Sequence, residues 1–90
     1  MSKREKLRQK LRNNPKGVKF SELETLLQRY EFTRIRVAGS HHIYRHSGNT
    51  KLVIPVHGNM VKPEYVNIVI ETLDGLYPEI ETDQEAGDDE

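Results

Sequence analysis

The spacing of apolar residues along the chain predicts three helices. The first is short, over residues 3–12, and it begins with the Ser-x-x-Glu pattern of a capping box. The second begins with the same pattern at Ser21 and carries leucines at helical spacing over 21–30. The third has a proline in its first turn and an apolar face over 63–76. Pro78 ends any continuation of that helix.

Between the second and third helices the chain has the alternation that is typical of strands. Over 32–37, Ile35 and Val37 fall on one side of a strand, whereas Arg34 and Arg36 fall on the other. This pattern predicts a half-buried strand with a basic outer face. Further strands are predicted over 41–45 and 51–56, because a Gly-Ser turn precedes the first of these and a Ser-Gly-Asn-Thr loop separates the two.

The predicted order is therefore helix, helix, three strands, helix. Short turns favour antiparallel pairing, and strands with helices on one face form a two-layer α+β domain whose other sheet face is open. The first helix is an N-terminal extension of this unit. The predicted core consists of Leu23, Leu26, Leu27, Ile35, Val37, Leu52, Ile54, Ile68, Val69, Leu73 and Leu76.

Composition divides the chain further. The 90 residues carry no net charge, yet residues 1–50 carry a net +8 and residues 51–90 a net −8. A basic half is suited to a polyanionic partner, and an acidic tail to covering basic surface. We expect a basic extension over 1–17, one domain over 18–77 and an acidic disordered tail over 78–90. The chain has no cysteine, no secretion signal and no membrane span, so we expect a soluble cytoplasmic protein.

Three of the four histidines lie within residues 41–46 and raise the question of a metal site. On a strand, His42 and His46 share a face but are too far apart to hold one ion, and His41 points to the opposite face. A zinc site often includes a carboxylate or a thiolate, and neither occurs between Glu31 and Glu64. We therefore expect no metal and no other cofactor.

A histidine can instead transfer a proton at neutral pH. RNA carries its own nucleophile, the 2′-OH beside the phosphodiester, so a histidine among arginines is sufficient for its cleavage. Arg34, Arg36, Arg45 and Lys51 are candidates for phosphate contacts, and Ser40 could bind phosphate or orient His41. Tyr44 could stack on a base, although a core or edge position is at least as common for such a tyrosine. These residues fit a binding module equally well.

The stretch Gly39-Ser40-His41-His42-Ile43-Tyr44-Arg45-His46, followed by Ile54-Pro55-Val56-His57-Gly58, resembles the HicA-type toxins of bacterial toxin–antitoxin pairs. The resemblance covers roughly residues 18–76. It implies a double-stranded-RNA-binding-domain-like fold, metal-independent cleavage of mRNA and a HicB-type antitoxin as partner.

In this family the catalytic histidine lies in the Gly-Ser-His turn. The resemblance therefore points to His41 as the general acid/base, with His42 as second choice. Gly39 is expected to shape the site, and His57 to shape the site or the antitoxin interface rather than to transfer protons. The segment 1–17 and the acidic tail are additional to the simplest family members.

Three functions follow as hypotheses. The first is an mRNA-cleaving toxin that binds RNA on the basic sheet face. The alternatives are a non-catalytic RNA-binding module of the same fold and a small protein-interaction domain. The charge split adds a hypothesis about the tail, which could fold over the basic sheet face and compete with RNA.

Overall fold

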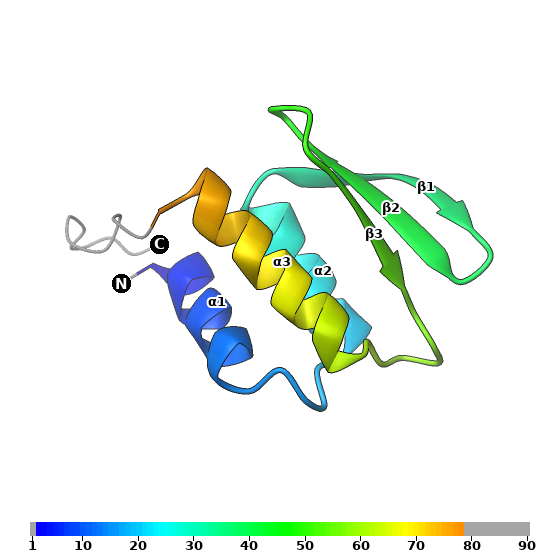
Figure 1. Cartoon of the computed structure of the whole chain (residues 1–90), viewed down its shortest axis with the longest axis horizontal. Coiled ribbons are helices and arrows are strands. Elements are labelled where there is room, and N and C mark those ends of the chain that lie inside the picture. Colours follow the sequence, from blue (N-terminus) through cyan, green and yellow to red (C-terminus); the bar gives the residue numbers. More distant parts are fainter. Residues whose placement is uncertain (1, 79–90) are drawn as a thin grey trace.

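The computed structural model describes residues 2–78, which form three helices and one three-stranded sheet (Figure 1). The elements are α1 (Lys3–Asn13), α2 (Phe20–Arg29), β1 (Phe32–Ala38), β2 (His41–His46), β3 (Lys51–Pro55) and α3 (Pro63–Leu76). The predicted element order and the α+β class are confirmed. The disorder predicted for the acidic tail concerns residues 79–90, which lie outside the described residues.

Local sequence explains where the helices begin. Ser2 and Glu5 form the expected capping box at α1, because the Ser2 hydroxyl accepts from the Glu5 N–H at 3.2 Å and the Glu5 carboxylate accepts from the Ser2 N–H at 3.3 Å. Helix α2 begins at Phe20, one residue earlier than predicted, and the Glu22 carboxylate accepts from the Lys19 N–H. Pro63 occupies the first turn of α3 as expected.

The helices all lie on one face of the sheet, and the other face is open (Figure 1). Helix α2 contacts β1 and helix α3 contacts β3, so these two helices cover the strands. Helix α1 packs against α2 and α3, on their side away from the sheet. In the described part of the chain, no helix is both long and apolar enough to cross a membrane.

The sheet is antiparallel with strand order β1-β2-β3. Its register shifts between Arg34 and Arg36, which leaves Ile35 as an extra residue in β1. Such a β-bulge breaks the simple alternation of side chains. Arg34 pairs with Tyr44 and Arg36 pairs with Ile43, so the two arginines lie on opposite faces of the sheet. The prediction that they share a basic outer face was wrong.

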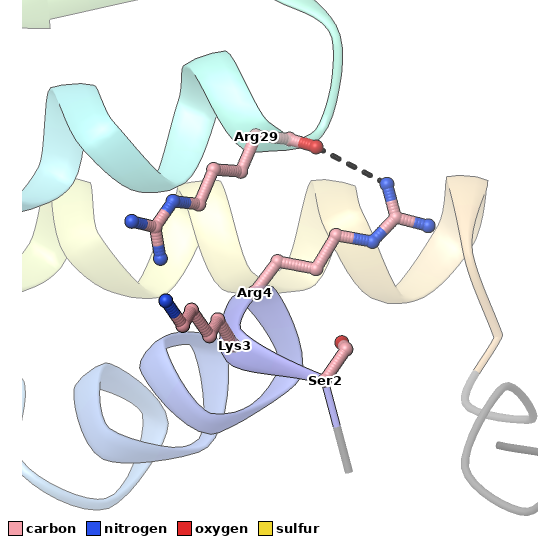
Figure 2. Close-up of a pocket in the computed structure, with 4 residues that line it drawn as sticks. All are labelled: Ser2, Lys3, Arg4 and Arg29. Atoms are coloured by element: carbon pink, nitrogen blue, oxygen red, sulfur yellow. Dashed lines mark hydrogen bonds between the residues drawn. The ribbon is translucent and has the colours of Figure 1, made fainter. Parts of the chain in front are cut away.

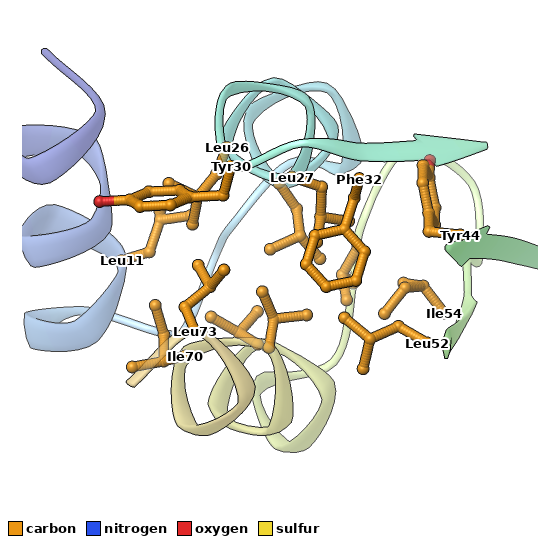
Figure 3. Close-up of a cluster of buried hydrophobic side chains, with 14 of the residues drawn as sticks. Leu11, Leu26, Leu27, Tyr30, Phe32, Tyr44, Leu52, Ile54, Ile70 and Leu73 are labelled. Carbon is orange, nitrogen blue, oxygen red and sulfur yellow. The ribbon is translucent and has the colours of Figure 1, made fainter. Parts of the chain in front are cut away.

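The core fills the space between the sheet, α2 and α3, and it extends to α1 through Leu11 (Figure 3). Three aromatic side chains dominate it, Tyr30, Phe32 and Tyr44, each at most 2% exposed. Fully burying a side chain of this size contributes roughly 1.5–3 kcal/mol. The aromatic residues therefore supply much of the stability of a small domain.

Most of the predicted core is confirmed, and three of its members are not buried. Ile35, Val37 and Ile68 are 46%, 49% and 44% exposed. The bulge and the edge position of β1 account for the first two. Leu76 is half-buried and packs against the core. The buried hydrophobic residues that the prediction omitted are Leu11, Val18, Tyr30, Phe32, Tyr44, Val61, Val66 and Ile70.

Helix α1 is fastened to the end of α3 by ion pairs as well as by apolar contact. Arg8 is only 4% exposed, and its guanidinium donates to the Asp74 carboxylate at 2.7 Å and to the Tyr77 carbonyl at 2.8 Å. Arg12 donates to both oxygens of the same carboxylate. The hydrogen bonds from Arg12 and then Arg8 lower the pKa of Asp74 to about 2.

Candidate functional site

The open face of the sheet can be assigned from the strand register. Tyr44 and His46 of β2 are buried against the helices, so His41, Ile43 and Arg45 face the other way. Paired residues of neighbouring strands share a face. The open face is therefore made of Thr33, Arg36, Ala38, His41, Ile43, Arg45, Lys51, Val53 and Pro55.

His41 lies at one end of this face, directly after the turn that joins β1 and β2. It is exposed, and its neighbours in the sheet are Ala38 and Pro55. Gly39 in the turn has φ +62°, a left-handed conformation that glycine adopts without strain. The Ser40 carbonyl accepts from the Val56 N–H at 2.8 Å, which ties the turn to the end of β3. The backbone before His41 is thus held in place while the imidazole stays accessible.

His57 lies beside this turn along the chain, since it follows Val56. It is exposed, and its backbone pairs with Met60 through two hydrogen bonds of 3.1 Å. Gly58, with φ +65°, makes the tight turn between them possible. The structure therefore brings Gly39, Ser40, His41 and the backbone that carries His57 to the same end of the sheet.

His42 lies on the covered face. Its ring is half-buried against Phe20, with the two ring centroids 4.6 Å apart. Its Nδ1 atom is buried without a hydrogen-bond partner. The expectation that His41 and His42 point to opposite faces is confirmed by the register, in which Ala38 pairs with the first and Val37 with the second.

Three cations follow His41 along the open face. Arg36 is the nearest in register, because it pairs with Ile43, two residues along β2 from His41. Arg45 and Lys51 pair with each other at the far end of the face, and both are exposed. Like charges directly opposite in a sheet repel. This end of the face thus has a positive potential that suits an anionic ligand.

Two of the sequence candidates have another environment. Tyr44 is fully buried, and its hydroxyl donates to the Glu24 carboxylate at 2.7 Å. Burial, together with this carboxylate, raises the pKa of Tyr44 above its usual value. Arg34 lies on the same side and forms an ion pair with Glu24 at 3.3 Å. Of the two positions that the sequence allowed for Tyr44, the structure shows the one in the core, so no face of its ring is exposed to a base. Arg34 is outside the open face.

His46 has a structural environment that the sequence did not indicate. It is 9% exposed, its Nδ1 accepts from the Gly48 N–H at 3.0 Å, and its Nε2 lies 2.8 Å from the Tyr77 hydroxyl. Its ring also contacts Phe32. Tyr77, the aromatic residue after the last helix, could have indicated a buried partner for His46. The two residues are 31 positions apart in the sequence, so no local pattern connects them. Within residues 2–78, no three side chains of the metal-binding types gather into a group that could hold an ion.

The fold and the site define a small α+β domain with an open cationic sheet face and an exposed histidine at its turn. Residues 20–74 match the family model of the HicA toxin of bacterial toxin–antitoxin systems, and the chain belongs to this family. No curated protein and no solved structure matches it. Membership implies, at the level of the family, an mRNA-interferase type of function and an antitoxin partner.

Proposed function

We propose that the chain is a toxin that cleaves mRNA, with RNA bound across the open sheet face and His41 as the general acid/base. The observation that carries the proposal is the difference between two adjacent histidines. His41 is exposed beside a fixed turn on the cationic face, whereas His42 is packed against Phe20 on the other face. The order α2-β1-β2-β3-α3 also agrees with the double-stranded-RNA-binding-domain-like fold that the family resemblance implies.

In the proposed reaction, the imidazole of His41 accepts the proton of a 2′-OH. The 2′ oxygen then attacks the adjacent phosphorus. The O2′–P bond forms and the P–O5′ bond breaks. The leaving O5′ takes up a proton from water, and His41 returns the proton that it accepted to the solvent. Strand geometry places Arg36 roughly 7 Å along the face from His41 and Arg45 roughly 13 Å from it. Arg36 is therefore the cation suited to the reacting phosphate, and Arg45 with Lys51 to phosphates further along the strand.

Ser40 has a supporting role in this proposal, because its exposed hydroxyl lies in the same turn and can donate to a phosphate oxygen. Gly39 and His57 shape the site. Tyr44 is not part of the proposed RNA surface, because its ring is buried. The proposed reaction uses side chains of this face alone and needs no bound metal.

A HicB-type antitoxin is the proposed protein partner. Exposed apolar side chains accompany the cations: Val53 lies on the open face at 45% exposure, and Ile35, the extra residue in the edge strand β1, is 46% exposed. A protein that covers both the apolar and the cationic groups would block access to His41. An acidic surface with apolar anchors is the complementary chemistry.

The test is cleavage of a mixed mRNA substrate in EDTA by the wild type, His41→Ala and His42→Ala, with RNA binding measured in parallel. Loss of a general acid/base lowers the rate by about 10²–10⁴-fold, so we expect His41→Ala to bind RNA without cleaving it. We expect His42→Ala to cleave and to be less stable.

Each other result points elsewhere. Equal cleavage by the wild type and His41→Ala would contradict the assignment of His41, and loss in His42→Ala alone would move it to His42. Binding without cleavage by all three would favour the RNA-binding module. If no RNA is bound, the protein-interaction domain is favoured.

A further inference from the structure

A second cationic site lies away from the sheet, where the start of α1 meets the end of α2. A pocket of about 330 Å³ is lined by Ser2, Lys3, Arg4 and Arg29 (Figure 2). Three of the four described residues that line it are basic, and these three come from two different helices. Residues 2–4 lie outside the segment that matches the family model.

Arg4 forms a fixed wall of this pocket. Its guanidinium donates to the Arg29 carbonyl at 3.1 Å and lies over the rings of Tyr30 and Tyr77, at 4.5 and 5.2 Å from their centroids. These contacts hold the two helix ends together. The pocket is thus a defined feature of the folded chain and does not depend on one flexible side chain.

Lys3 and Arg29 supply the remaining charge. Both are exposed, and in Figure 2 their side chains extend to the same side of the pocket. Among the ion pairs between described residues, Lys10 pairs with Glu22 and both Arg8 and Arg12 pair with Asp74, but none includes Lys3 or Arg29. Within residues 2–78 these two cations therefore have no counter-ion.

The described part of the chain ends one residue after Tyr77, which contacts one of the residues that line this pocket. The Tyr77 ring is in contact with Arg4, and Pro78 is the last described residue. Seven of the twelve residues that follow are Asp or Glu. A short tether gives a neighbouring site a high effective concentration of carboxylates. The open sheet face is on the far side of α2 and α3 from α1 (Figure 1).

We infer that this pocket is the docking site of the acidic segment 79–90 of the same chain, with its carboxylates bound by Lys3 and Arg29. The segment then neutralises the cations at the junction of α1 and α2 and leaves the open sheet face available. This differs from the sequence-based hypothesis in which the tail covers the sheet. The inference is independent of whether the protein cleaves RNA.

The test uses the full chain, which has no cysteine, so that a spin label can be attached to a single Ala86→Cys substitution. We expect the label to broaden the backbone amide signals of Lys3, Arg4 and Arg29 in NMR spectra more than those of Arg36 and Arg45. Broadening should decrease in about 1 M salt, where the Debye length is only about 3 Å.

A change of charge supplies the control. Lys3→Glu with Arg29→Gln should abolish the localised broadening; a Glu at position 3 is compatible with the first turn of α1, and Gln at position 29 removes the charge without placing a carboxylate in the last turn of α2. The matched variant, Lys16→Glu with Lys62→Gln, removes two exposed lysines elsewhere and should leave it unchanged. Broadening of Arg36 and Arg45 would overturn the inference in favour of the sheet. So would broadening that is absent, spread evenly over the surface or unchanged by the Lys3/Arg29 substitutions.

Discussion

The side chains of β2 have different environments on the two faces of the sheet. On the covered face, the Tyr44 hydroxyl of β2 lies 2.7 Å from Glu24 and the His46 Nε2 lies 2.8 Å from the Tyr77 hydroxyl, whereas the Nδ1 atom of His42 is buried without a partner. On the open face, Arg45 is exposed and lies opposite another cation, Lys51. Two of the three polar side chains that β2 places on the covered face are thus hydrogen-bonded within the fold, whereas the cations of the open face are exposed to solvent.

This difference separates the residues that stabilise the domain from the residues that it exposes to solvent on the open face. A buried polar group must be hydrogen-bonded because its desolvation is otherwise uncompensated. A pair of like charges on a surface lowers stability slightly and has no structural benefit. Sequences tolerate such local conflicts chiefly where function needs them. The open face, with His41 at one end and the cation pair at the other, fits that description.

The largest expected effect comes from removing Tyr44 from the covered face. Tyr44→Ala deletes a fully buried ring and its hydrogen bond to Glu24. Large aromatic-to-alanine changes in a core cost about 3–5 kcal/mol, a substantial share of the roughly 5–15 kcal/mol that is typical of a whole domain. Urea unfolding monitored by circular dichroism measures this loss.

Val53→Ala is the matched change on the open face, since Val53 is 45% exposed. Strand propensity differences span only about 1 kcal/mol, so a smaller loss is expected there. Equal losses for the two variants would mean that the faces do not differ in the way described.

The helices were predictable because their signals are local. The Ser2–Glu5 capping box and the proline in the first turn of α3 each involve residues at most three positions apart. The hairpin turns are similarly short, and Gly39 has a positive φ, which explains why a glycine occupies this turn. These features do not depend on which distant segment packs against them.

The bulge in β1 was not predictable in this way. Nothing at Ile35 differs from an ordinary strand residue, and its exposure follows from pairing with β2 and from the position of α2. The error at Ile68 has a related cause. The run Val66-Asn67-Ile68-Val69-Ile70 is almost entirely apolar, so its periodicity does not identify the buried side.

The candidate site was predictable to a similar extent. Strand alternation correctly separated His41 from His42, because β2 is regular. Tyr44 and Arg34 were candidates for RNA contact. Their actual partner, Glu24, is on helix α2, 20 residues from Tyr44 and 10 residues from Arg34 along the sequence. Contacts across such distances depend on tertiary packing, which a single sequence does not reveal.

A second, smaller effect is expected where α1 packs against α3, on the side of the helices away from the sheet. Asp74→Asn removes the carboxylate that accepts hydrogen bonds from the buried Arg8 guanidinium and from Arg12. Loss of hydrogen bonds to a charged group costs about 1–3 kcal/mol, so the variant should be less stable by this amount in urea unfolding. Glu71→Gln, an exposed carboxylate on the same helix, should change stability by less than about 0.5 kcal/mol.

The ion pairs of Asp74 with Arg12 and Arg8 should also make the stability depend on pH in the acid range. The pKa of Asp74 is lowered from 3.8 to about 2 by Arg12 and Arg8. The stabilisation is therefore fully present above pH 3.8 and is lost as the pH falls through 2. Because the Asp74 side chain is 41% exposed, solvent screening limits this component to about 1 kcal/mol or less. It should be absent from the Asp74→Asn variant, and an identical acid response of the two proteins would contradict it.

The smallest expected effect, on the open face, has the opposite sign for stability. Lys51→Gln relieves the repulsion from Arg45, so the free energy of unfolding should rise by a few tenths of a kcal/mol (~0.2–0.5) at low salt. The same change removes a phosphate contact, so RNA affinity should fall and its dependence on log[salt] become shallower by roughly 0.7. Lys16→Gln, an exposed lysine in the α1–α2 connection, should do neither. A Lys51 variant that loses both stability and affinity would show that the lysine is structural. A gain in one with a loss in the other is what a face kept for an anionic ligand requires.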